Sequence, residues 1–219
     1  MARRTLLLIT LFVEGGLFVI GLLLIGGLDQ LLSRFSLSWR ATAYALMLCI
    51  PMLTMLYLSE RTQWPPLARL RDELNEKVMP IFANCKIIDL AVIALLAGAG
   101  EELFFRGWLQ GALIGKFGVL SGILIASAIF GFAHYLSPIY AIYAGLTGVY
   151  LGLIYQTSGN LYIVMVIHAI YDFIAMVYLV RKGRSDGISS LLERKNDKRK
   201  DFFTSRSRMD RCVFSRNFY

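Results

Sequence analysis

Six long apolar runs dominate this sequence of 219 residues and constrain its fold more than any other feature. A helix needs about 20 apolar residues to cross the hydrocarbon core of a bilayer. Only 17% of the residues are charged, fewer than in most soluble domains. The sequence therefore predicts an all-α polytopic membrane bundle of about six transmembrane helices. The runs occupy residues 5–28, 41–58, 87–113, 119–133, 139–155 and 161–180.

The first run follows Arg3 and Arg4 and so resembles a secretory signal peptide. However, the run is longer than such a segment, and Glu14 interrupts it. No small-x-small cleavage site follows it either. We therefore expect a retained transmembrane helix.

The basic residues are concentrated near the end of the chain. Residues 181–219 hold 12 of the 23 Lys and Arg residues against five acidic ones. A basic segment beside a membrane helix suits anionic headgroups, and this position favours a topological role over nucleic-acid binding. With the N-terminus in the cytoplasm, six helices put 19 of the 23 basic residues on the cytoplasmic side, as the positive-inside rule requires. The sequence predicts an integral protein of the plasma membrane with both termini cytoplasmic.

Composition divides the chain into four segments. Proline opens the stretch after the second apolar run, where leucines and charges then recur at roughly helical spacing. Lys, Arg, Ser and Asp dominate after the last run, which is typical of disorder. We expect two N-terminal transmembrane helices, an amphipathic cytoplasmic linker, a core and a basic disordered cytoplasmic tail, in residues 1–60, 61–86, 87–180 and 181–219 respectively.

Protonatable side chains interrupt or end three of the apolar runs. Such groups are costly at hydrocarbon depth unless they are paired or face water, so by default they mark a functional site. His134 and His168 are the only histidines of the chain. The full set of candidate site residues is Glu101, Glu102, Arg106, His134, His168 and Asp172.

Turns in the chain predict that these groups lie at similar depths. If the chain reverses near Phe117, Glu101 lies 16 residues before the turn and His134 lies 17 after it. At a rise of about 1.5 Å per residue, the two are about 24 and 26 Å from the turn. A second reversal at 157–160 puts His168 about 14 Å inward from the same side. Polar groups from three helices can therefore converge in an intramembrane active site.

Helical spacing pairs some of these residues. Glu102 and Arg106 are four apart and share a helix face, as do His168 and Asp172. The second pair lets Asp172 accept a hydrogen bond from the imidazole and set its tautomer. Glu101 is rotated by about 100° from Glu102, so the two carboxylates can have different roles. In the alternative interpretation the two Glu residues are interfacial charges, and the third helix ends near residue 105.

A Glu with two His residues admits two hydrolytic mechanisms. In one, Glu101, His134 and His168 bind a divalent metal such as zinc, which activates a water molecule. In the other, no cofactor is required: a buried Glu acts as general base, a His assists it, and other groups stabilise the oxyanion. The His-Glu-x-x-His spacing of soluble zinc proteases is absent, so spacing does not favour the metal.

Three motifs follow one another on successive apolar segments: Glu101-Glu102-x-x-x-Arg106, Phe130-x-x-x-His134 and His168-x-x-x-Asp172. In this order they resemble the motifs of the CPBP family of intramembrane proteases, which includes type II CAAX prenyl endopeptidases and bacteriocin-immunity proteins. The resemblance covers about residues 87–180. It implies an α-helical membrane core with a catalytic cavity open toward the cytosol.

The resemblance also implies roles for the individual residues. Glu101 corresponds to the base that activates water, with His134 as its partner. Glu102 and Arg106 correspond to an orienting pair. The family is often labelled as metalloproteases, but the resemblance favours a glutamate mechanism without a metal.

His168 and Asp172 correspond to the residues that hold the oxyanion. CAAX-cleaving members typically have Asn at the second position, and an ionised Asp cannot donate a hydrogen bond. Either Asp172 is protonated, or it orients His168 and only the imidazole donates. This departure from the family pattern argues against a CAAX substrate more than it argues against hydrolysis.

These features predict an intramembrane endopeptidase that uses glutamate- and histidine-activated water. Its expected partners are the lipid bilayer and a peptide or protein substrate at the membrane, with CAAX-type processing of a prenylated protein as one form. A non-catalytic immunity or scaffold protein of the same fold is the alternative. A proton-coupled transporter is disfavoured because the sequence has no inverted repeats.

Overall fold

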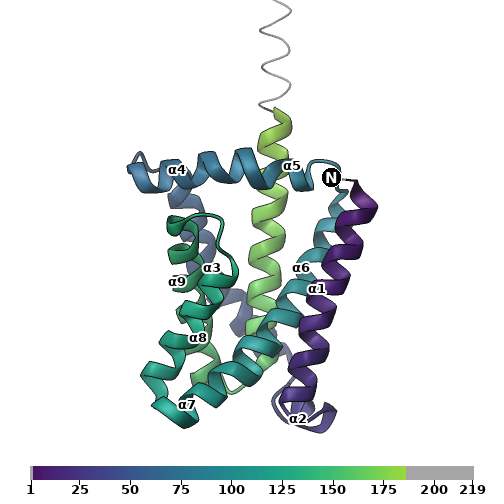
Figure 1. Ribbon diagram of the computed structural model, residues 1–219, viewed down its shortest axis with the longest axis vertical. Coiled ribbons are helices and arrows are strands. Elements are labelled where there is room, and N and C mark those ends of the chain that lie inside the picture. The colour runs from purple at the N-terminus through teal and green to yellow at the C-terminus, as the bar shows by residue number, and fades with distance from the viewer. Residues whose placement is uncertain (1, 186–219) are drawn as a thin grey trace, which may run out of the picture. The chain divides into compact units, whose positions relative to one another are not determined.

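The computed structural model describes residues 2–185, and every regular element in this range is a helix (Figure 1). The chain divides into two units after Leu179, and the helices discussed here belong to the first. Most of the expected basic tail, residues 186–219, lies outside the described residues. The helices are α1 (Arg3–Leu24), α2 (Leu28–Ser33), α3 (Trp39–Arg61), α4 (Pro65–Glu73), a π-helix (Leu74–Val78), α5 (Met79–Phe82), α6 (Ile87–Glu102), a second π-helix (Leu103–Gln110), α7 (Gly111–Phe117), α8 (Val119–Ala133), α9 (Pro138–Ser158) and a last helix (Leu161–Ser185).

The predicted all-α membrane bundle is confirmed. Within the described range, α1, α3, α9 and the last helix are long and apolar enough to cross a membrane. A fifth span results if Pro65–Phe82 and Ile87–Phe117, which are bent by 109° to each other, count as one; α8 is apolar but shorter. Large apolar side chains such as Phe12 on α1 and Leu120 on α8 are mostly exposed, which suits lipid as their surroundings. The protein is therefore an integral membrane protein.

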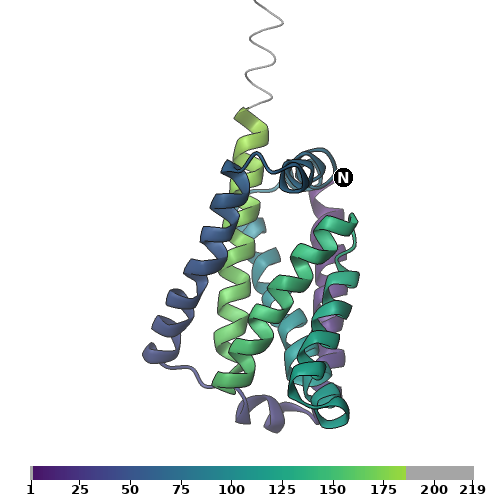
Figure 2. The same ribbon diagram turned by 90° about the vertical axis from the view of Figure 1, so that its left-hand side faces the viewer.

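The segment that was expected to form an amphipathic linker is helical from Pro65 to Phe82. Two prolines start it, because the first helical positions have no backbone partner for their N–H groups. It lies across the ends of the long helices, as Figures 1 and 2 show from two directions. Leu70 on its inner side is buried. This segment therefore covers one end of the helix bundle.

Small residues hold α6 between α1 and the last helix. The backbone carbonyl of Glu14 on α1 occupies the space where a Cβ at Gly100 would project. On the other side, a Cβ at Gly98 would lie 2.8 Å from the carbonyl oxygen of Met165. Glycines allow such close backbone approach in membrane bundles. Glu101, which follows Gly100, is thus fixed between two neighbouring helices.

The Gly100→Ala variant is expected to be destabilised by about 1–3 kcal/mol, the usual cost of overfilling a packed site. The added methyl group collides with the backbone of Glu14, which cannot rotate away. The measurement is the thermal unfolding midpoint of the purified protein in one detergent. Gly111→Ala is the matched control, since nothing lies within 4 Å of its added Cβ and alanine favours the helix. Equal midpoints for the two variants would contradict this account of α6.

Candidate active site

The helix that carries the two adjacent glutamates does not end near residue 105. The second π-helix continues α6 without a break, and α7 extends it to Phe117. The alternative that Glu101 and Glu102 are interfacial charges at a helix end is therefore wrong. Both side chains are buried, with relative exposures of 7% and 0%. Short π-helical insertions within α-helices occur frequently at functional sites.

Glu102 is the centre of a buried ion cluster. Its Oε1 lies 2.8 Å from Nη1 of Arg106 and 2.6 Å from Nδ1 of His168. Arg106 also donates from Nη2 to the backbone carbonyl of Gly148 on α9, at 3.1 Å. Charges that are removed from water need such partners, because desolvation otherwise exceeds the Coulomb gain. The cluster thus ties together α6, the π-helix, α9 and the last helix.

Glu101 faces both histidines. Its Oε2 is 3.4 Å from Nε2 of His134 and 4.0 Å from Nε2 of His168. This oxygen is buried and makes no hydrogen bond to any residue in the described part of the chain. The two carboxylates therefore point to different partners: Glu101 to His134, and Glu102 to Arg106 and His168.

His134 is oriented by the end of its own helix. It caps the C-terminus of α8, and its Nδ1 lies 2.9 Å from the carbonyl oxygen of Phe130. A carbonyl only accepts, so Nδ1 carries a proton and Nε2 of the neutral ring is a proton acceptor. Since the carboxylate of Glu101 is an acceptor too, these two facing atoms can share one proton. Glu101 and His134 together form an acid–base pair.

The phenyl ring of Phe130 separates the charged groups. Its centroid lies 4.4 Å from that of the His134 ring. The guanidinium carbon of Arg106 lies 4.5 Å from the same centroid, within the range of a cation–π contact. Phe130 is buried. It therefore covers the imidazole on one side and the guanidinium on the other.

Asp172 completes the surroundings of His168. Its Oδ2 lies 3.4 Å from Nε2 of His168, one turn away on the last helix. A carboxylate oxygen thus faces each ring nitrogen, Glu102 at Nδ1 and Asp172 at Nε2. Only the imidazolium form has two N–H donors, so this arrangement suits a charged ring. Asp172 is thus placed to accept a hydrogen bond from His168.

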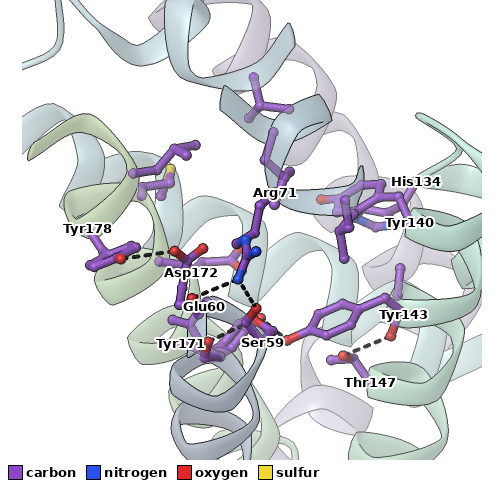
Figure 3. A pocket seen from close by; sticks show the side chains of 18 of the residues that line it. Ser59, Glu60, Arg71, His134, Tyr140, Tyr143, Thr147, Tyr171, Asp172 and Tyr178 are labelled. Carbon is purple, nitrogen blue, oxygen red and sulfur yellow. Dashed lines mark hydrogen bonds between the residues drawn. The ribbon is translucent and has the colours of Figure 1, made fainter. Parts of the chain in front are cut away.

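The site opens onto a cavity of about 250 Å³ (Figure 3). His134, His168 and Asp172 line it together with side chains from α3, α4, the first π-helix, α5, α6, α8 and α9. Most of the wall is apolar or aromatic. The tyrosines of this wall, Tyr140, Tyr143 and Tyr171, were not singled out from the sequence. Tyrosine inside an apolar helix has no distinguishing pattern, and only the fold brings these three together.

One further acid lies close to the site. In the sequence Glu14 appeared only as an interruption of the first apolar run. It stands on α1 where that helix contacts Gly100, beside Glu101. Its Oε2 is buried and has no hydrogen-bond partner among residues 2–185. An acidic residue inside an apolar run is rare, so the sequence alone could have marked Glu14 as a candidate site residue.

The residues do not form a recognisable metal site. Within residues 2–185, no group of three or more His, Cys, Asp or Glu residues has the geometry to hold a metal ion. This includes Glu101, His134 and His168, for which the sequence left a zinc site open. No step of the mechanism proposed below passes through a metal.

A bundle of apolar helices with a buried Glu, His and Arg cluster beside a cavity defines a polytopic membrane protein. Residues 83–174 match the family described as type II CAAX prenyl endopeptidase Rce1-like. This segment contains all three motifs, and the match confirms the resemblance inferred from the sequence. No curated protein and no solved structure matches the chain.

Proposed function

We propose that the protein is an intramembrane endopeptidase that hydrolyses a peptide bond of a membrane-associated protein, with CAAX-type processing of a prenylated C-terminus as its substrate class. The observation that carries this proposal is the acid–base pair of Glu101 and His134, whose facing atoms lie 3.4 Å apart. The family match supports the substrate class. The mostly apolar cavity suits the aliphatic residues of such a C-terminus.

The first step is the activation of water. Glu101 takes a proton from the water molecule, and the oxygen adds to the carbonyl carbon of the scissile bond. His134 stabilises the proton between Nε2 and the carboxylate, while its Nδ1 stays bonded to the carbonyl oxygen of Phe130. Positioned acid–base catalysis of this kind contributes about 10²- to 10⁴-fold to a rate.

The second step forms and breaks the tetrahedral intermediate. The electron pair of the carbonyl π bond moves to oxygen, and the N–H at Nε2 of His168 donates to this oxyanion. When the carbonyl re-forms, the carbon–nitrogen bond breaks, and the proton held by Glu101 and His134 passes to the amine nitrogen. The products are a carboxylate and a free amine, as in any peptide-bond hydrolysis.

The remaining members of the cluster act as positioning residues. Glu102 bonds Nδ1 of His168 at 2.6 Å and so fixes the direction of Nε2. Arg106 balances the charge of Glu102 and connects the pair to α9. Preorganised charges of this type need no rearrangement as the oxyanion develops.

This proposal is tested with the purified protein in proteoliposomes and a farnesylated peptide ending in Cys-aliphatic-aliphatic-X that carries a fluorophore and a quencher. We expect cleavage directly after the modified cysteine. Natural substrates are identified by comparing the membrane peptides of cells that carry the wild-type chain with those of cells that carry Glu101→Gln. A peptide that accumulates intact only in the variant cells is a substrate.

We also propose that both termini lie in the cytoplasm and that the protein resides in the plasma membrane. Arg3 forms an ion pair with Asp89, so the N-terminus lies at the end of α6 where the segment 65–82 also lies. An epitope tag at the N-terminus should bind antibody only after cells are permeabilised. A tag in the turn at Gly118 should bind antibody on intact cells, and the opposite labelling pattern would refute this orientation.

A further inference from the structure

The proposed mechanism leaves the oxyanion short of hydrogen-bond donors. Asp172 stands where CAAX-cleaving members typically have Asn, and an ionised carboxylate only accepts. Both nitrogens of His168 face carboxylates: Nδ1 is 2.6 Å from Glu102, and Nε2 is 3.4 Å from Asp172. The oxyanion of acyl hydrolysis usually receives two donors. A neutral donor from another residue is therefore required.

The cavity wall offers few free hydroxyl groups. The hydroxyl of Ser59 donates to Leu56, and that of Thr147 donates to Tyr143, in both cases to a backbone carbonyl. Nη1 of Arg71 is bonded to three backbone carbonyls at the end of α3. These donors already bond backbone carbonyls, so they are not free to bind the oxyanion.

The tyrosines differ in this respect. Tyr143 and Tyr171 bond each other through their hydroxyl oxygens at 2.8 Å, and Tyr178 donates to Glu60. The hydroxyl of Tyr140, by contrast, makes no hydrogen bond to any described residue, although it lines the same cavity as His134, His168 and Asp172. Tyr140 thus provides an uncommitted neutral donor.

The fold fixes Tyr140 beside His134. Tyr140 lies in the first turn of α9, where its backbone N–H donates to the hydroxyl of Ser137, the N-cap residue, at 3.4 Å. Gly131 on α8 allows α9 to approach closely, since a Cβ there would lie 2.5 Å from the carbonyl oxygen of Ala141. Figure 3 shows Tyr140 next to His134, with its hydroxyl end pointing into the pocket.

We propose that the hydroxyl of Tyr140 is a catalytic donor that binds the oxyanion together with Nε2–H of His168. It takes the role that the side-chain amide of Asn has in CAAX-cleaving members, at the position where this chain has Asp172. A phenol is suited to this role because it donates while remaining neutral. The inference rests on the proposed peptidase function and concerns only how its intermediate is stabilised.

Tyr140→Phe removes only the hydroxyl. We expect kcat for the farnesylated peptide to fall about 10²-fold, as for the loss of one oxyanion donor, while KM changes little. Because this hydroxyl has no hydrogen-bond partner among residues 2–185, the thermal midpoint should stay at the wild-type value. Tyr155→Phe is the matched control from the same helix, because Tyr155 is not among the residues that line the cavity, and it should retain cleavage. A normal kcat for Tyr140→Phe, or a lowered thermal midpoint, overturns the proposal.

Asp172→Asn provides the second arm of the test. In the Tyr140→Phe background the new amide can donate to the oxyanion, so we expect kcat to recover about tenfold or more. A purely structural role of Tyr140 predicts no such rescue, and its absence would overturn the proposal. If Glu101→Gln still cleaves the peptide, the proposed peptidase function is wrong. If Glu101→Gln is inactive but Tyr140→Phe is fully active, only the proposal for Tyr140 is wrong.

Discussion

Glu101→Gln is expected to lower kcat for the farnesylated peptide by about 10²- to 10⁴-fold, the contribution of a positioned general base. Glutamine has the same shape as glutamate but cannot take a proton from water. Its neutral amide also removes the acceptor that shares a proton with His134, 3.4 Å away. The fold should persist, since Oε2 of Glu101 holds no hydrogen bond in the described part of the chain. The measurement is the initial cleavage rate in proteoliposomes, with the thermal midpoint recorded for the same preparation.

Glu76→Gln is the matched control, because Glu76 is an exposed carboxylate that does not line the cavity. It should cleave at the wild-type rate. Wild-type cleavage by Glu101→Gln would refute the general base. A non-catalytic immunity protein of the same fold predicts a different result: protection of cells against a bacteriocin would persist in Glu101→Gln.

Glu102→Leu is expected to lower the free energy of unfolding by about 3–5 kcal/mol, the usual cost of removing one partner of a buried ion pair. Glu102 is fully buried, and its loss leaves Arg106 without a carboxylate at a site that is only 2% exposed. His168 loses the acceptor at its Nδ1 in the same step. Thermal unfolding in a single detergent measures the effect, and cleavage should be lost as well.

The double variant Glu102→Leu with Arg106→Met tests whether the stability loss comes from the unpaired charge of Arg106 or from the change in side-chain volume. Removing both partners leaves no uncompensated guanidinium, so this variant should recover much of the lost stability. It should not recover cleavage, because His168 remains without its orienting carboxylate. A double variant that is less stable than Glu102→Leu would contradict the charge explanation.

Much of the site could be predicted because its residues stand out against their surroundings. Protonatable side chains in apolar runs are costly, which marked Glu101 and His134 without any structure. Helical spacing then paired Glu102 with Arg106, and their atoms lie 2.8 Å apart. Counting residues from the turn near Phe117 put Glu101 and His134 at one depth. The structure brings these two side chains together.

The contact of Glu102 with His168 could not be predicted in this way. The two residues are 66 positions apart, so no local periodicity connects them. Which glutamate meets which histidine depends on how the helices are rotated about their axes. The π-helix that starts at Leu103 changes that rotation within the motif itself, because its hydrogen bonds span five residues rather than four. Spacing rules based on 3.6 residues per turn still pair Glu102 with Arg106, but they do not give the rotation of one helix against another.

Residues that precede the segment matched by the family model also contribute to the site and its surroundings. The family match begins at residue 83, yet the backbone of α1 presses on Gly100, directly before Glu101. Gly21 on the same helix lies against Leu103. Ser59 and Arg71, which also precede the match, line the cavity. The matched segment is therefore not self-contained: a chain cut back to it would uncover Glu101 and lose one wall of the cavity.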